Sequence, residues 1–176
     1  MRIISGKYKS RRFDVPKTFR AHPTTDFAKE NLFNVITPWM DWEETLALDL
    51  FAGTGSIGFE LLSRGCKEVI CVEKDPHHYA FIQKVKAELK DERLTALRGD
   101  AFKYIASCRQ SFDFIFADPP YALKELPLLP EMIISRRLIK TDGVFVMEHP
   151  KEFDFSTLPS FSQRRTYGAV NFSIFY

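Results

Sequence analysis

The sequence predicts an α/β fold with a doubly wound, mostly parallel sheet, and three observations indicate it. Apolar strand-like runs alternate with helix-like segments along most of the chain. The run at 112–117 is almost continuously apolar, which is typical of a strand buried on both faces. The last two strand-like runs are separated only by a turn at Gly168, so they must pair antiparallel. We therefore expect seven strands, mostly parallel, with an antiparallel C-terminal hairpin at one edge.

The elements follow in order from the N-terminus. Residues 2–5 and 11–15 predict a short hairpin, and Thr24, Thr25 and Asp26 are N-cap candidates for a helix over 26–37. A further helix begins at Asp75-Pro76, because proline suits the first helical position. The other predicted helices are 59–64, 102–107 and 125–138, and the strands are 45–51, 69–72, 94–97, 112–117, 143–148, 161–167 and 170–175.

Composition predicts one compact domain for the 176 residues, 45% of which are hydrophobic. No apolar stretch approaches the eighteen residues of a membrane span, and the N-terminus does not resemble a signal peptide. The three cysteines and four histidines lack metal-ligand spacing. We expect a cytoplasmic monomer with reduced thiols and no metal.

Positive charge is concentrated near the N-terminus, where Asp14 is the one acidic residue among the first twenty. Tyr8, Phe13 and Phe19 are interleaved with these charges, a pattern typical of polyanion binding. The aromatic residues would equally suit a segment that only packs on the body. We expect a basic nucleic-acid-binding arm over 1–22 and a main domain over 23–176. The candidate contacts are Arg2, Lys7, Lys9, Arg11, Arg12, Lys17 and Arg20.

The tetrad Asp118-Pro119-Pro120-Tyr121 follows a buried strand, at the end where open α/β sheets bind ligands. Its two prolines remove backbone N–H donors. The Asp118 carboxylate and neighbouring carbonyls then form a rim of acceptors that suits an exocyclic amino group. Tyr121 offers an aromatic face for a base. A simple Asp-Pro loop is the alternative interpretation.

A glycine-rich turn, Gly53, Gly55 and Gly58, joins the strand 45–51 to the next helix. This G-x-G-x-x-G context predicts a nucleoside-type cofactor, and Glu73, twenty residues after Gly53, suits ribose hydroxyls. The motif alone does not choose between a dinucleotide and S-adenosylmethionine. Asp49 favours the second, because its charge would repel a pyrophosphate and attract a sulfonium or an amine. Asp100 ends the third strand, where it would either accept an adenine amino group or cap a helix.

The chain resembles the RsmD family of bacterial 16S rRNA guanine-N2 methyltransferases nearly from end to end. The glycine turn and the tetrad are shared by many amino-methyltransferases, whereas the N-terminal pattern is more specific to the family. The residues that carry the resemblance are 1–7, 23–26, 30–34, 49–56, 62–65, 72–75, 98–101, 118–121 and 167–168. His22, Phe27, Ala28 and the stretch after Gly168 depart from the usual pattern.

The resemblance implies a Rossmann-like methyltransferase fold and activity of the 16S rRNA (guanine(966)-N(2))-methyltransferase type. The substrate would be 16S rRNA or the small ribosomal subunit. Asp118, Pro119, Pro120 and Tyr121 would hold the target amine and its base. S-adenosylmethionine would be bound by Thr24, Asp49, Phe51, Gly53, Gly55, Glu73, Lys74, Asp100 and Ala101.

Three other functions remain open at this point. An N6-adenine or N4-cytosine DNA methyltransferase uses the same tetrad, although such enzymes usually carry an added recognition domain. An NAD-dependent oxidoreductase would share the glycine turn. A non-catalytic RNA-binding assembly factor would need neither Asp118 nor Tyr121.

Overall fold

The computed structural model describes residues 1–19 and 24–176, and its centre is one seven-stranded sheet. The strand order is β3-β2-β1-β4-β5-β7-β6. The strands are β1 (Leu46–Leu50), β2 (Glu68–Glu73), β3 (Leu94–Arg98), β4 (Phe112–Ala117), β5 (Ile139–His149), β6 (Phe161–Tyr167) and β7 (Val170–Phe175). The helices are α1 (Asp26–Ile36), α2 (Ser56–Ser63), α3 (Pro76–Leu89), α4 (Ala101–Ser107) and α5 (Leu129–Ser135), with 3₁₀ turns η1 (Thr37–Trp39), η2 (Trp42–Glu44) and η3 (Leu126–Leu128).

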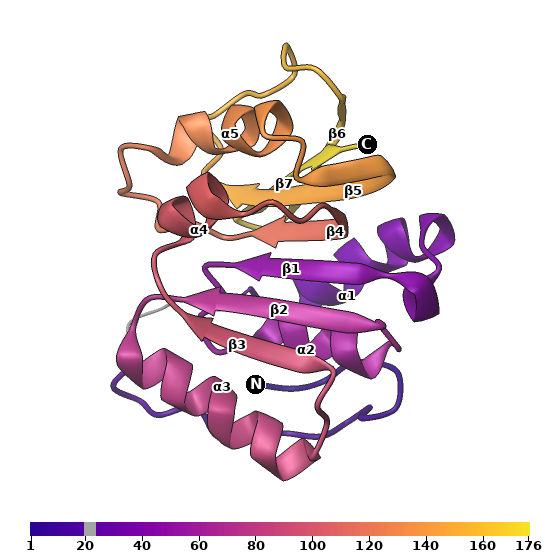
Figure 1. The fold of residues 1–176 in the computed structure, drawn as a ribbon, viewed down its shortest axis with the longest axis vertical. Coiled ribbons are helices and arrows are strands. Elements are labelled where there is room, and N and C mark those ends of the chain that lie inside the picture. The colour runs from indigo at the N-terminus through magenta and orange to yellow at the C-terminus, as the bar shows by residue number, and fades with distance from the viewer. Residues whose placement is uncertain (20–23) are drawn as a thin grey trace.

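The predicted topology is confirmed. Strands β1 to β5 pair in parallel, whereas β7 pairs antiparallel with both β5 and β6. The arrowheads of β1, β2 and β4 therefore point to the same side of the sheet (Figure 1). This carboxyl edge also receives the turn between β6 and β7, because β6 runs parallel to β5. Ligands of open α/β sheets bind at such an edge.

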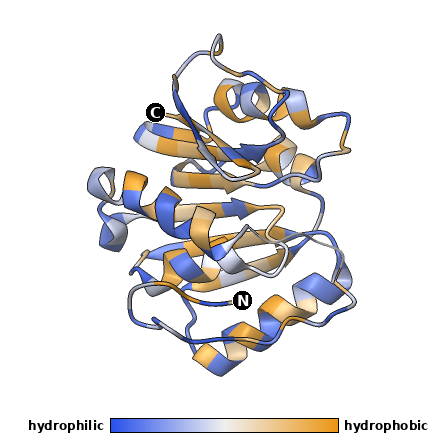
Figure 2. Cartoon of the chain, turned by 180° about the vertical axis from the view of Figure 1, so that it is seen from behind, coloured by the Kyte–Doolittle hydropathy of each residue, from blue (hydrophilic) through white to orange (hydrophobic). Residues whose placement is uncertain are grey.

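Helices cover both faces of the sheet, and each face has its own apolar cluster. Helices α1, α2 and α3 pack on one face, and α4 and α5 pack on the other. The strands between them appear as largely apolar bands (Figure 2). Successive side chains of β4 point alternately into the two clusters. Phe114 and Phe116 face α1, whereas Ile115 and Ala117 face α5. Asp118 follows on the α1 side in this alternation.

The N-terminal segment packs against the body of the protein through its apolar residues. Ile3, Tyr8 and Phe13 are buried in the α1-side cluster. The expected hairpin is reduced to a single antiparallel bridge between Arg2 and Arg12. The aromatic side chains of the arm thus serve packing, while most of its charges stay exposed. The boundary expected at 22 lies outside the described residues, so the division into two domains stays a prediction.

The predicted helix over 125–138 is too long. The structure has η3 at 126–128 and α5 at 129–135, followed by an early start of β5 at Ile139. Pro127 and Pro130 each remove a backbone donor near the start, and Arg137 ends the segment with a φ of 55°. Among the described helices, none is both long and apolar enough to cross a membrane.

Candidate functional site

The glycine turn after β1 is strongly curved, and its three glycines differ in their surroundings. A Cβ at Gly58 would lie 2.3 Å from the Cys71 sulfur, and one at Gly55 would lie 2.8 Å from the Phe59 ring. These two glycines allow α2 to pack closely on the sheet. Gly53 has a φ of 58° and nothing within 4 Å of its Cβ position. The backbone at Gly53 therefore borders open space at the carboxyl edge.

Glu73 holds this turn from the end of β2. Its two carboxylate oxygens accept hydrogen bonds from the backbone N–H of Gly53 (2.6 Å) and of Asp75 (2.9 Å). The side chain is nearly buried. Glu73 therefore orients the exposed face of Gly53, and each of its oxygens keeps a further lone pair for a ligand hydroxyl.

Asp49 is buried beneath the same turn rather than facing outward. Its carboxylate accepts a hydrogen bond from the Gly58 N–H at 2.9 Å. Burial and, to a lesser extent, the charge of Glu73 raise the pKa of Asp49 to about 8, against the lowering effect of that hydrogen bond. Asp49 thus places a desolvated acid under the glycine turn.

The other predicted cofactor residues surround the ends of β1 and β3. Asp100 caps α4 through the Lys103 N–H at 3.1 Å, and the Lys74 ammonium lies 3.6 Å from its carboxylate. Ala101 is buried as the first residue of α4. Phe51 has a φ of 58° and its ring meets Phe102 edge to face at 5.7 Å. The helix cap that we expected as an alternative for Asp100 is therefore present, and it leaves the second carboxylate oxygen near solvent.

Three acidic side chains share the α1-facing side of the carboxyl edge. Asp49 of β1 lies beside Phe116 of β4. Ala117 of β4 lies beside Met147 of β5, so the next residues along these two strands, Asp118 and Glu148, are also side by side. Desolvation raises the pKa of Asp118 well above its usual range, and the charges of Glu148 and Asp49 add to this. Within residues 1–19 and 24–176, no group donates a hydrogen bond to the Asp118 carboxylate. The site therefore holds an acid with free acceptor capacity.

Glu148 is the residue that our sequence analysis missed. It is buried and accepts hydrogen bonds from the Thr24 hydroxyl (2.7 Å) and the Tyr121 hydroxyl (3.2 Å). Burial raises its pKa, and both hydrogen bonds oppose the rise. A signal was available, since Glu148 ends an apolar strand just as Asp118 does. Thr24, expected on the cofactor, instead contacts the tetrad side.

Residues 3–12 of the basic arm lie away from the tetrad, whereas residues 14–19 return along α3 toward Glu73. The Lys7 N–H donates to the carbonyl of Ser63 at the end of α2, and the Tyr8 hydroxyl donates to Asp91 just after α3. Helices of parallel βαβ units run opposite to the strands, so both anchors lie at the amino edge. Arg2 differs, because it pairs with Asp26 at the start of α1 at 2.9 Å. Lys9, Arg11, Arg12 and Lys17 are exposed, and Arg20 and His22 lie outside the described residues.

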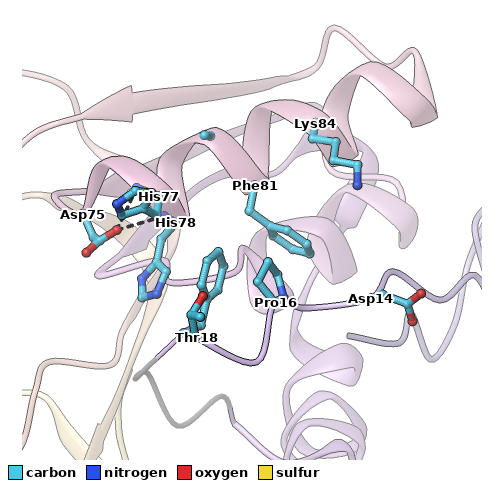
Figure 3. A pocket seen from close by; sticks show the side chains of 10 residues that line it. Asp14, Pro16, Thr18, Asp75, His77, His78, Phe81 and Lys84 are labelled. Atoms are coloured by element: carbon cyan, nitrogen blue, oxygen red, sulfur yellow. Dashed lines mark hydrogen bonds between the residues drawn. The ribbon is translucent and has the colours of Figure 1, made fainter.

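A groove of about 740 Å³ lies between α3 and residues 14–19 (Figure 3). Pro16, Phe81 and His78 point into it, and the Phe19 ring lies 4.4 Å from the His78 ring. His78 also approaches Glu73, with 3.9 Å between Nδ1 and the carboxylate. The groove therefore adjoins the cofactor side, although its lining includes neither the glycine turn nor the tetrad.

The chain is similar to known proteins along its whole length. A family model described as "Conserved hypothetical protein 95" matches residues 1–176. YlbH of Bacillus subtilis (strain 168) is 36% identical, over 99% of this chain and 98% of YlbH. "Ribosomal RNA small subunit methyltransferase D" of Escherichia coli (strain K12) is 28% identical, over 91% of this chain and 80% of that protein.

A solved structure gives the same result for the fold. The structure of yhhF from Escherichia coli superimposes with a TM-score of 0.86 at 26% identity, and covers 99% of this chain and 96% of yhhF. The fold is thus the Rossmann-like methyltransferase fold. Because the family model matches the whole chain and a relative is more than one-third identical from end to end, the chain belongs to the RsmD family of ribosomal RNA methyltransferases.

Proposed function

We propose that the protein transfers a methyl group from S-adenosylmethionine to the exocyclic N2 amine of a guanine in small-subunit ribosomal RNA. The observation that carries the proposal is the Asp118 carboxylate, which has free acceptor capacity beside Tyr121 and the glycine turn. Family membership supports the reaction class. The 16S rRNA target, with a guanine of the 966 type, is inferred from the names of the relatives.

The residues around the glycine turn fit S-adenosylmethionine better than a pyrophosphate cofactor. Gly53 borders open space, and Glu73 and Asp100 offer acceptors for hydroxyl and amino groups. Asp49, Asp118 and Glu148 make the local charge negative when they ionise, which favours a cation and disfavours phosphate. We assign the cofactor to Asp49, Phe51, Gly53, Gly55, Glu73, Lys74, Asp100 and Ala101. Thr24 holds Glu148 on the tetrad side.

The chemistry supplied by the cofactor is an electrophilic methyl group on a sulfonium. The guanine amine is a weak nucleophile because its lone pair is conjugated with the ring. Asp118 and the Pro119 carbonyl would accept hydrogen bonds from the two N–H groups of this amine and align its nitrogen for attack. As the nitrogen–carbon bond forms and the carbon–sulfur bond breaks, S-adenosylhomocysteine would leave and positive charge would pass to the nitrogen, where the Asp118 carboxylate would stabilise it. Positioning of the two reactants contributes a further part of the acceleration.

The raised pKa of Asp118 suits a second role in the same step. A carboxylate with a raised pKa is a better base, so Asp118 can take the proton that the methylated amine releases. A cation bound nearby favours the ionised carboxylate, because opposite charges lower the pKa of an acid. Cofactor binding would therefore prepare Asp118 to act.

Tyr121 would stack on the target base, and Glu148 would fix its orientation through the tyrosine hydroxyl. A base held in this way must leave its own stack or come from a single strand. The basic arm, Arg2, Lys7, Lys9, Arg11, Arg12, Lys17 and Arg20, would contact phosphates. We propose further that the protein acts as a cytoplasmic monomer without a metal, with 1–22 as arm and 23–176 as catalytic domain.

Transfer to RNA is the direct test. Purified protein would be incubated with labelled S-adenosylmethionine and either transcribed small-subunit rRNA or small subunits from cells that lack the protein. Digestion and mass spectrometry would then identify the methylated nucleoside and its position. We expect N2-methylguanosine at one position. Transfer to adenine or cytosine, or none to either substrate, would contradict the proposal.

A further inference from the structure

Phe27 and Tyr167 form an aromatic pair on the surface near the tetrad. Phe27 lies in the first turn of α1 and is 63% exposed, the highest value among the large apolar side chains of the described residues. Its ring meets the Tyr167 ring edge to face, with 6.2 Å between centroids and 89° between planes. The ring is thus held by an aromatic neighbour and stays accessible to a planar partner.

The pair is anchored in the sheet that carries Asp118. Tyr167 packs on Phe172 with 6.1 Å between ring centroids, and Phe172 packs on Phe116 with 6.2 Å between centroids. Phe172 and Phe116 are buried, and Phe116 lies two residues before Asp118. A continuous row of aromatic rings therefore runs from the core to the surface, and it holds Phe27 in a fixed place.

Phe27 lies on the same face and at the same edge of the sheet as the acidic cluster. Phe172 of β7 lies opposite Glu148 on β5 and opposite Arg165 on β6. Tyr167 follows Arg165 by two residues, so it shares that face. Two strand spacings separate β5 from β6, and two residues along β6 separate Tyr167 from Arg165, which puts the Tyr167 backbone roughly 12 Å from that of Glu148.

We propose that Phe27, supported by Tyr167, is a stacking surface for a nucleobase next to the target guanine. This inference rests on the proposed function, because it needs RNA in the tetrad site. Taking one base out of its stack uncovers the faces of its neighbours. A fixed aromatic ring on this side of the site can cover one of those faces, whatever the base, because every base has a π-face.

The surroundings of Phe27 favour RNA over a protein partner. Its exposed neighbours on α1, Asp26, Glu30 and Asn34, are polar, so α1 presents no broad apolar patch around the ring. Arg2 lies against Asp26 and is partly exposed, which places a cation of the basic arm beside the aromatic pair. One isolated ring with a nearby cation suits a nucleotide, with its base and its phosphate.

The test compares Phe27→Ala with the matched control Tyr176→Ala. Tyr176 is also exposed, at 58%, and stacks on Trp39 at 5.4 Å, but it follows β7 at the amino edge. On whichever RNA substrate the wild type methylates, we expect Phe27→Ala to raise the KM for RNA roughly 5- to 100-fold. We expect kcat and the affinity for S-adenosylhomocysteine to change less than about twofold, Phe27→Trp to keep the wild-type KM, and Tyr176→Ala to change nothing.

A crosslinking experiment identifies what lies on the ring. With p-benzoylphenylalanine at position 27, irradiation should link the protein to a nucleotide adjacent to the methylated guanine. Links to a ribosomal protein or to distant nucleotides would overturn the inference, as would an unchanged KM for Phe27→Ala. Each of these outcomes requires an active wild type. An inactive wild type instead refutes the proposed function, so the two failures are distinguishable.

Discussion

Glu73 and Asp118 both lie at the carboxyl ends of parallel strands, β2 and β4, on either side of β1, yet they are held differently. Glu73 accepts two backbone N–H hydrogen bonds, and Asp49 and Asp100 each accept one. Asp118 accepts none from the described residues, and Glu148 is held by two side-chain hydroxyls. The cofactor half of the site is therefore fixed by the backbone fold, whereas the tetrad half depends on a few side chains. Single substitutions should affect catalysis most in the tetrad half.

The largest effect is expected for Asp118→Ala. Loss of the acceptor for the amine should lower kcat at least about a hundredfold, as for removal of one preorganised electrostatic partner. The affinity for S-adenosylhomocysteine, measured by calorimetry, should stay close to that of the wild type, because the cofactor half is held independently. Asp118→Asn should retain partial activity, since an amide oxygen still accepts. Wild-type turnover of Asp118→Ala would remove Asp118 from the mechanism.

A smaller effect on catalysis is expected for Glu148, which acts through Thr24 and Tyr121. Glu148→Ala leaves the buried Thr24 hydroxyl and the partly exposed Tyr121 hydroxyl without their acceptor, and we expect kcat to fall roughly tenfold with about 1–3 kcal/mol of lost stability. Glu148→Gln keeps an acceptor and should restore much of both. Both substitutions should also shift the pH profile of kcat toward lower pH, because each removes the Glu148 charge that raises the pKa of Asp118. An unshifted profile would mean that Glu148 is only structural.

The sequence predicted the cofactor half more completely than the tetrad half, for a physical reason. The glycine turn and Glu73 are recognisable because local backbone geometry demands them, and the mostly parallel sheet follows from α/β alternation. The Thr24–Glu148 hydrogen bond joins residues 124 positions apart, and no local pattern shows such a contact. The same holds for Lys29, a charged residue that is fully buried against Glu60 and Ser56.

The pH dependence of stability tests how strongly the acidic cluster is desolvated. The pKa of Asp49 is raised from 3.8 to about 8, so the folded protein binds a proton that the unfolded chain releases. The free energy of unfolding should therefore fall as the pH rises from about 4 to about 8, by up to about 1.4 kcal/mol per pH unit for one proton. Urea unfolding of Asp49→Asn should show a flatter dependence. Stability that rises over this window would contradict the raised pKa.

Two alanine substitutions separate packing from ligand contact in the glycine turn. Gly58→Ala would push a Cβ to 2.3 Å from the Cys71 sulfur, and overpacking of this kind costs about 1–3 kcal/mol. Gly53→Ala meets no atom within 4 Å but must adopt a φ of 58°, which costs about 1–2 kcal/mol. We expect Gly58→Ala to lower Tm more, and Gly53→Ala to lower the affinity for S-adenosylhomocysteine more. The reverse order would place the cofactor elsewhere.

The smallest effects are expected on the basic arm, and they should depend on position. Arg2 lies at the start of α1 near the tetrad, whereas Lys7 is anchored beside the end of α2 at the amino edge. Reversing all four charges at Lys7, Lys9, Arg11 and Arg12 should weaken RNA binding and flatten its salt dependence, because fewer counterions are released.

Single substitutions compare the two positions. Arg2→Glu should raise the Kd for RNA more than Lys7→Glu, measured by filter binding at two salt concentrations. Equal effects at the two positions would mean that RNA follows the arm around to the amino edge. Unchanged affinity of the fourfold variant at low salt would instead show that these four charges serve only solubility, and that RNA is held at the carboxyl edge alone.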